Sequence, residues 1–217
     1  MIDATTDETL PETTRRLHRL LMDAMITTGN VPPAIDLAAA LRVDLETLRY
    51  HLRTLEHADY LGFDAAGRLI CLYPFSAVPA PLDKAIEGEQ RFAMCSIDAL
   101  GMSAMLGRRL EIESACPICG AEIWLVVRPG NIERAEPSET VVIARRDADR
   151  PAFEACCGFT VFACGDNHAN VLKARTSGTS ALDLETALSV GESIFAGMLN
   201  NTLPNKRKRA LIRMEGT

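Results

Sequence analysis

The apolar positions in the first sixty residues repeat with a helical period. Residues 11–30 carry leucine and methionine at spacings of three and four, and Gly29-Asn30 provides a stop, which predicts a helix. A shorter helix is predicted over residues 34–42, and Asp44 can cap a third that carries a leucine stripe. Residues 61–73 follow as a predicted β-hairpin. Three helices and a hairpin indicate a winged-helix-like arrangement.

Prolines at positions 74, 79 and 81 mark a connection to a second region with a different pattern. This region is predicted to begin with a helix over residues 84–106 and to end with a helix over about 182–202. Strands are predicted between them, over residues 109–114, 122–128, 140–145 and 159–164. We therefore predict an α+β protein with three parts: a helical, winged-helix-like region (1–80), the strand-rich core on which it packs (81–203), and a basic C-terminal tail (204–217).

Composition and charge narrow the classes of protein. The 217 residues are 47% hydrophobic with a net charge of −6, which disfavours a nucleic-acid partner that depends on phosphate neutralisation. No apolar run approaches the roughly 18 to 20 residues needed to cross a bilayer, so no membrane partner is expected. The acidic N-terminus lacks the features of a signal peptide, and the expected location is the cytoplasm.

Seven cysteines suggest thiol chemistry or metal binding, because an odd number in a reducing compartment argues against a disulfide framework. Cys95 and Asp98 share a predicted helix at a spacing of i, i+3, so both side chains can face one ligand. Cys156-Cys157 is a vicinal pair that precedes a predicted strand. Taken alone, each motif is also compatible with buried thiols that only pack.

Taken together, the motifs resemble the organomercurial (alkylmercury) lyases. The resemblance runs from Arg91 to about Asn200, roughly half the chain, and it preserves the order and spacing of the two cysteine sites. The matching segments are Phe92-Ala93-Met94-Cys95-Ser96-Ile97-Asp98-Ala99-Leu100, Leu106-Gly107-Arg108, Ile112-Glu113-Ser114-Ala115-Cys116-Pro117, Gly120-Ala121, Ala135-Glu136-Pro137, and Cys156-Cys157 with Phe159-Thr160-Val161-Phe162-Ala163.

The resemblance implies a lyase in which Cys95, Cys156 and Asp98 are catalytic and bind mercury, with Cys157 adjacent to the site and Cys116 structural. Mercury(II) is soft and prefers thiolate ligands. A second thiolate pushes electron density toward the carbon, and Asp98 can take a proton from a thiol and deliver it to that carbon. An apolar pocket would help the carboxyl hold the proton. The side chains expected to line it are Phe92, Met94, Phe159 and Phe162.

Cys119 departs from the family pattern, because Cys116-Pro117-Ile118-Cys119-Gly120 forms a Cys-x-x-Cys knuckle. Cys119 is grouped with Cys116 as a structural thiol. With Cys156 and Cys157 the knuckle would offer four thiols, enough for zinc, and that site would compete with the lyase interpretation. Cys164 is interpreted as strand packing. The four histidines (His18, His51, His57 and His168, the last in a predicted loop) are interpreted as surface or internally hydrogen-bonded residues.

Two alternatives to the lyase remain open: a thiol-based metal-sensing transcriptional regulator, and a structural-zinc relative of the lyase fold. For the regulator, Arg49 and Arg53 could project from a recognition helix, but neighbouring carboxylates oppose DNA binding. The lyase interpretation implies an organomercurial substrate and no organic cofactor. It further implies small cytosolic thiols as partners and mercuric reductase as the acceptor of Hg(II).

Overall fold

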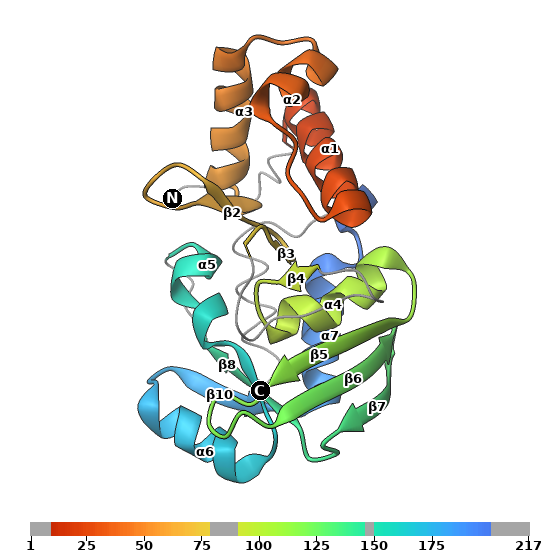
Figure 1. Cartoon of the computed structure of the whole chain (residues 1–217), viewed down its shortest axis with the longest axis vertical. Helices are drawn as coiled ribbons and strands as arrows, with labels where there is room; N and C mark the ends of the chain where they lie inside the picture. Colours follow the sequence, from red (N-terminus) through yellow and green to blue (C-terminus); the bar gives the residue numbers. More distant parts are fainter. Residues whose placement is uncertain (1–9, 79–90, 146–149, 201–217) are drawn as a thin grey trace, which may run out of the picture.

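The protein has a helical end and a sheet-containing end (Figure 1). The computed structural model describes residues 10–78, 91–145 and 150–200. Helices and strands both contribute to the described core, so the predicted mixed class is confirmed. The predicted tail, 204–217, lies outside the described residues.

The three N-terminal helices form as the apolar pattern predicts. They are α1 (Glu12–Thr28), α2 (Ala34–Leu41) and α3 (Leu45–His57). Asp44 caps α3, since its Oδ1 accepts a hydrogen bond from the Thr47 amide at 2.7 Å. The predicted stripe of α1 faces inward, with Leu17, Leu21 and Met25 buried. Local sequence therefore specifies this end of the molecule.

The predicted hairpin is the first half of a larger sheet. Its strands pair antiparallel in the order β1-β2-β3-β4 and are β1 (Leu61–Phe63), β2 (Leu69–Leu72), β3 (Phe75–Ser76) and β4 (Phe92–Ala93). A helix was predicted over residues 84–106, and this prediction is wrong for residues 91–95. Phe92–Ala93 forms β4, which pairs with β3, and the helix begins only at Ser96. Residues 84–90 lie outside the described part. The sheet thus links the N-terminal helices directly to the next helix, α4.

Two further three-stranded sheets form the opposite end. One has the order β5-β6-β7 and the other β10-β8-β9, with all neighbours antiparallel. Their strands are β5 (Leu110–Ala115), β6 (Glu122–Arg128), β7 (Asn131–Glu136), β8 (Val141–Arg145), β9 (Val161–Ala163) and β10 (Thr179–Leu182). The pattern predicted β5, β6, β8 and β9, although the strand predicted over residues 159–164 is too long, because Phe159 lies in a 3-10 turn. It did not predict β10, nor β7, whose mostly exposed side chains gave no apolar signal.

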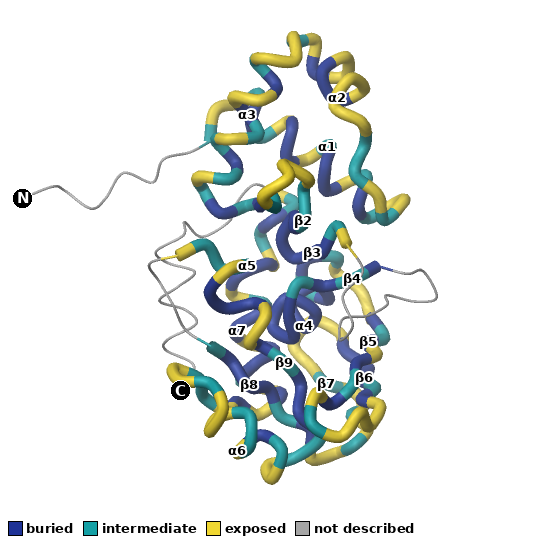
Figure 2. Tube along the Cα trace, turned by 60° about the vertical axis from the view of Figure 1, so that its left-hand side comes forward, coloured by how far each residue is buried: buried dark blue, intermediate teal, exposed yellow. Residues whose placement is uncertain are grey.

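Helix α4 (Ser96–Leu106) lies in the core and packs on α7 (Leu184–Phe195). Figure 2 shows α4 as buried along most of its length. The helix backbones approach closely at two glycines: a Cβ on Gly101 would lie 2.6 Å from the carbonyl oxygen of Gly191. Only glycine permits this approach, which fixes the position of α4.

Shorter elements complete the chain: α5 (Ala152–Ala155), the 3-10 turn η1 (Cys157–Phe159), α6 (Asp166–Arg175) and η2 (Met198–Asn200). The N-terminal region contacts α5 directly, because Asp59 Oδ1 accepts from the Ala152 amide at 3.4 Å. Arg91 also contacts the N-terminal region, because its Nε donates a hydrogen bond to the Met25 carbonyl at 2.9 Å. In the described part of the chain, no helix combines the length and apolar character that crossing a membrane requires.

Candidate functional site

Cys95, Asp98 and Cys157 form a buried group at the start of α4. Their ligand atoms all lie within 4.8 Å of one another. The exposed fractions are 2%, 0% and 3%, so bulk water is excluded from all three side chains. Cys95 is the N-cap of α4, and its Sγ accepts a hydrogen bond from the Asp98 amide at 3.5 Å. The predicted proximity of the first thiol and the carboxyl is therefore present.

The vicinal cysteines reach this group through the α5–η1 turn. Cys157 Sγ donates to Asp98 Oδ2 at 3.8 Å. Cys156 ends α5 and is 2% exposed, but it is not part of the group that lies within 4.8 Å. The family motif implies Cys156 as the second thiol, with Cys157 adjacent to the site. The structure shows that Cys157 itself contacts the carboxyl of Asp98.

Thr160 connects the two segments that carry these residues. Its hydroxyl donates to the Cys156 carbonyl at 3.0 Å and accepts from the Arg145 amide at 3.2 Å. Its carbonyl accepts from the Ser96 amide, the first residue of α4, at 3.3 Å. Because Thr160 is buried, these bonds hold the vicinal pair against α4 without competition from water.

The neighbouring side chains of Cys71 and Tyr73 are also buried. Burial raises the pKa of Tyr73 well above its ordinary value, and negative charge on Cys157 would raise it further. Burial likewise raises the pKa of the nearby Cys71 thiol, and the charge of Asp59 adds to the effect. Both side chains are consequently neutral at physiological pH.

The four residues predicted to line an apolar pocket differ in burial. Phe162 is buried, while Phe92 and Met94 are half-buried. Phe159 is 39% exposed, with the Arg145 guanidinium 4.3 Å from its ring centroid. Phe159 therefore does not close the pocket as predicted. Phe159 is the last residue of the 3-10 turn, whose first residue, Cys157, is buried.

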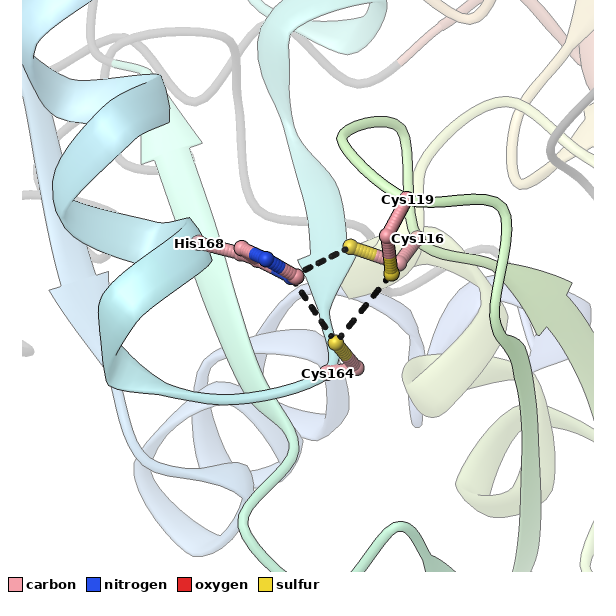
Figure 3. A group of neighbouring side chains, drawn as sticks. All are labelled: Cys116, Cys119, Cys164 and His168. Atoms are coloured by element: carbon pink, nitrogen blue, oxygen red, sulfur yellow. Dashed lines mark hydrogen bonds between the residues drawn. The ribbon is translucent and has the colours of Figure 1, made fainter.

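A second group of metal-ligating side chains lies between the two C-terminal sheets. Cys116 and Cys119, predicted as structural thiols, lie with Cys164 and His168, and all four ligand atoms are within 4.8 Å of one another (Figure 3). Two interpretations are corrected: Cys164 does more than pack on a strand, and His168 lies in the first turn of α6 rather than in a loop. The overlooked signal is the spacing Cys-x-x-x-His at a helix start.

The four-thiol zinc site considered for the knuckle does not form in the described structure. Cys157 lies with Cys95 and Asp98, and neither vicinal cysteine belongs to the second group. The two thiol chemistries therefore do not compete for the same residues. Burial raises the pKa of the Cys116 thiol, but the backbone amides of Cys164, Ile118 and Cys119 lower it more, to about 6.

Comparison with known proteins agrees with the resemblance found in the sequence. The family model described as alkylmercury lyase matches residues 75–196, more than half of the chain. A protein from Staphylococcus epidermidis named alkylmercury lyase is 29% identical over 173 residues, covering 79% of this chain and 78% of the relative. One of the same name from Bacillus cereus is 29% identical over 181 residues, covering 83% and 81%.

The fold has a counterpart among solved structures. The structure titled "Crystal structure of the mercury-bound form of MerB2" superposes with a TM-score of 0.72 at 22% identity, covering 88% of this chain and 93% of that chain. At this identity the likeness concerns the fold, and it extends beyond residues 75–196 into the N-terminal helices. Together with the match to the family model, the buried thiol–carboxyl group leads to one conclusion: this chain belongs to the alkylmercury lyase family.

Proposed function

We propose that the protein cleaves the carbon–mercury bond of organomercurials by protonation, R–Hg⁺ + H⁺ giving R–H and Hg²⁺. The observation that carries the proposal is the buried group of Cys95, Asp98 and Cys157 within 4.8 Å, which places a mercury-binding thiol beside a carboxyl. Thiols are the ligands mercury prefers, and a carboxyl can carry a proton. A thiol group without a proton carrier could bind mercury but would not break the bond.

The first step is capture of the substrate by Cys95. Its thiol releases a proton to the solution as sulfur binds R–Hg⁺, giving a neutral, two-coordinate Cys95–S–Hg–R adduct. Because Cys95 is the N-cap of α4, its Sγ lies at the positive end of the helix dipole, which favours the thiolate. Exclusion of water from the site protects the adduct from competing ligands.

A second thiolate and Asp98 then complete the reaction. The carboxylate of Asp98 accepts the proton of a second thiol, and the resulting thiolate adds to mercury and makes the bound carbon more basic. Asp98 returns the proton to that carbon, the carbon–mercury bond breaks, and R–H leaves. The Hg²⁺ ion remains on two thiolates. Full burial disfavours a charged carboxylate, so it favours uptake of the thiol proton and keeps that proton on Asp98 until the activated carbon accepts it.

The vicinal pair supplies the second thiolate. The family motif supports Cys156 in this role, as the sequence analysis expected. The geometry supports a separate role for Cys157, whose thiol contacts Asp98 Oδ2 and can orient the carboxyl toward the substrate. Replacing each cysteine separately distinguishes the two roles.

The remaining parts of the proposal concern partners and domains. Small thiols would remove Hg²⁺ by exchange and pass it to a mercuric reductase in the cytoplasm. The N-terminal region, proposed as a winged-helix-like unit of residues 1–80, would cover the catalytic core of residues 81–203. The N-terminal region would also hold the site in place, because Asp59 accepts a hydrogen bond from the first turn of α5, the helix that precedes the vicinal cysteines.

The direct test is incubation of the purified full chain with phenylmercury and excess small thiol, with benzene measured by gas chromatography. We expect catalytic release of benzene and none from the Cys95→Ala variant. Stoichiometric binding of mercury without benzene would refute the lyase and leave a thiol-based mercury-binding protein.

A further inference from the structure

We propose that Cys116, Cys119, Cys164 and His168 bind one zinc ion, which joins the two C-terminal sheets (Figure 3). This site is separate from the proposed lyase site. It shares no residue with the group formed by Cys95, Asp98 and Cys157.

The distances between the four side chains fit a tetrahedron around a single ion. With Zn–S bonds of about 2.3 Å and Zn–N bonds of about 2.0 to 2.1 Å, tetrahedral geometry separates two sulfurs by about 3.8 Å and a sulfur from a nitrogen by about 3.6 Å. Cys119 Sγ and Cys164 Sγ are 3.7 Å apart, and Cys116 Sγ is 3.5 Å from His168 Nδ1. The pair Cys164 Sγ and His168 Nδ1 is closer, at 3.0 Å. A cluster of several metal atoms would need a wider arrangement.

The ligand types select the metal and the kind of site. Three thiols and one imidazole suit zinc, whereas calcium and magnesium require oxygen ligands. Four protein ligands fill a tetrahedral shell and leave no position for substrate, which is typical of a structural zinc site. The group contains no carboxylate that could act on a bound molecule.

The knuckle between β5 and β6 prearranges two of the ligands. The Cys116 amide donates to the Ala121 carbonyl, and the Gly120 amide donates to the Cys116 carbonyl, both at 2.8 Å. Gly120 has a φ of +73°, which a glycine adopts without strain and which closes the turn. The sulfurs of Cys116 and Cys119 therefore face the same side before any metal binds.

The other two ligands come from a distant segment. Cys164 directly follows β9, and His168 lies in the first turn of α6, 52 positions from Cys116. The ion would tie the β5-β6-β7 sheet to the β10-β8-β9 sheet through these two segments. Strand β9 follows directly on η1, which contains Cys157, so the ion would also anchor the segment that carries the vicinal pair.

The test is the metal content of the full chain, purified under reducing conditions without chelator from zinc-supplemented medium. We expect close to one zinc ion per chain, measured by inductively coupled plasma mass spectrometry. Cys119→Ser and His168→Ala should lose most of the zinc, and His168→Cys, which restores a fourth ligand, should recover it. Cobalt substitution of the wild type should give the visible bands of tetrahedral Co²⁺ with a thiolate charge-transfer band.

Two control variants test where the zinc ion binds. His57→Ala removes a histidine outside both groups and should keep full zinc content. Cys95→Ala should also keep it, because that thiol belongs to the other group. A wild type without zinc, a Cys119–Cys164 disulfide in its place, or zinc lost only with Cys95 would each overturn the proposal. Zinc is measured without substrate, so the result does not depend on lyase activity.

Discussion

The protein carries two groups of neighbouring thiols, and the groups differ in burial and in ligand chemistry. Cys95, Asp98 and Cys157 are all buried, and a carboxyl replaces one possible soft ligand. In the second group, Cys119 is exposed and Cys164 half-buried, and all four side chains are good zinc ligands. A group with two thiols beside a carboxyl leaves room for a substrate on the metal and supplies a proton carrier, so it can react. A group with four zinc ligands fills the coordination shell of the ion and can only hold it.

The groups also differ in how the chain builds them. The first depends on the start of one core helix, held in place by the close approach of α4 and α7. The second depends on a tight turn and a helix start that lie at the ends of two sheets. Substitutions should therefore separate the two: changes in the first group should affect turnover and leave zinc in place.

The largest effect is expected from removing a mercury thiolate. Cys95→Ala and Cys156→Ala should each abolish hydrocarbon release, because one thiolate cannot both hold mercury and activate its carbon. Benzene release from phenylmercury measures the loss, and zinc content is the control for folding. Turnover near the wild-type rate in either variant would refute the two-thiolate mechanism as assigned here.

Asp98→Asn should have the next largest effect. The amide keeps the size and polarity of the side chain but cannot transfer the proton, so turnover should fall by roughly 100-fold or more. The variant should still bind one organomercurial per chain, as measured by mercury content after gel filtration. Unchanged turnover would exclude Asp98 as the proton carrier.

Cys157→Ala should have a smaller effect than Cys156→Ala. It removes the hydrogen bond to Asp98 Oδ2, and one such bond contributes about 1 kcal/mol, or roughly fivefold in rate. The two alanine variants are matched controls for each other, since both replace a buried thiol. An inactive Cys157→Ala beside an active Cys156→Ala would assign the second thiolate to the residue that contacts the carboxyl.

Gly101→Ala tests whether the position of α4 matters more to the first group than to the second. The added methyl would meet the backbone of α7, and overpacking of this kind typically lowers the free energy of unfolding by about 1 to 3 kcal/mol. Thermal unfolding should show a midpoint lower by about 2 to 4 °C per kcal/mol. Lyase turnover should decline as α4 shifts, while zinc stays bound. Unaltered stability and turnover would show that the helices can separate without consequence.

The sequence alone determined the elements that depend on local patterns. The leucine stripe of α1, the Asp44 cap of α3 and the β6 strand all follow from residues close together in the chain. The pairing of Cys95 with Asp98 belongs to the same category, because the two residues are only three positions apart. The motifs also indicated the family, which the family model confirmed.

Only the tertiary structure decided which distant side chains meet. Cys157 reaches Asp98 across 59 positions, and Cys164 reaches Cys119 across 45. These contacts depend on how the α5–η1 turn packs on α4 and how β9 and α6 meet the knuckle, and no local periodicity encodes that packing. The sequence therefore identified the reactive residue types, and long-range packing divided them into two groups with different chemistry.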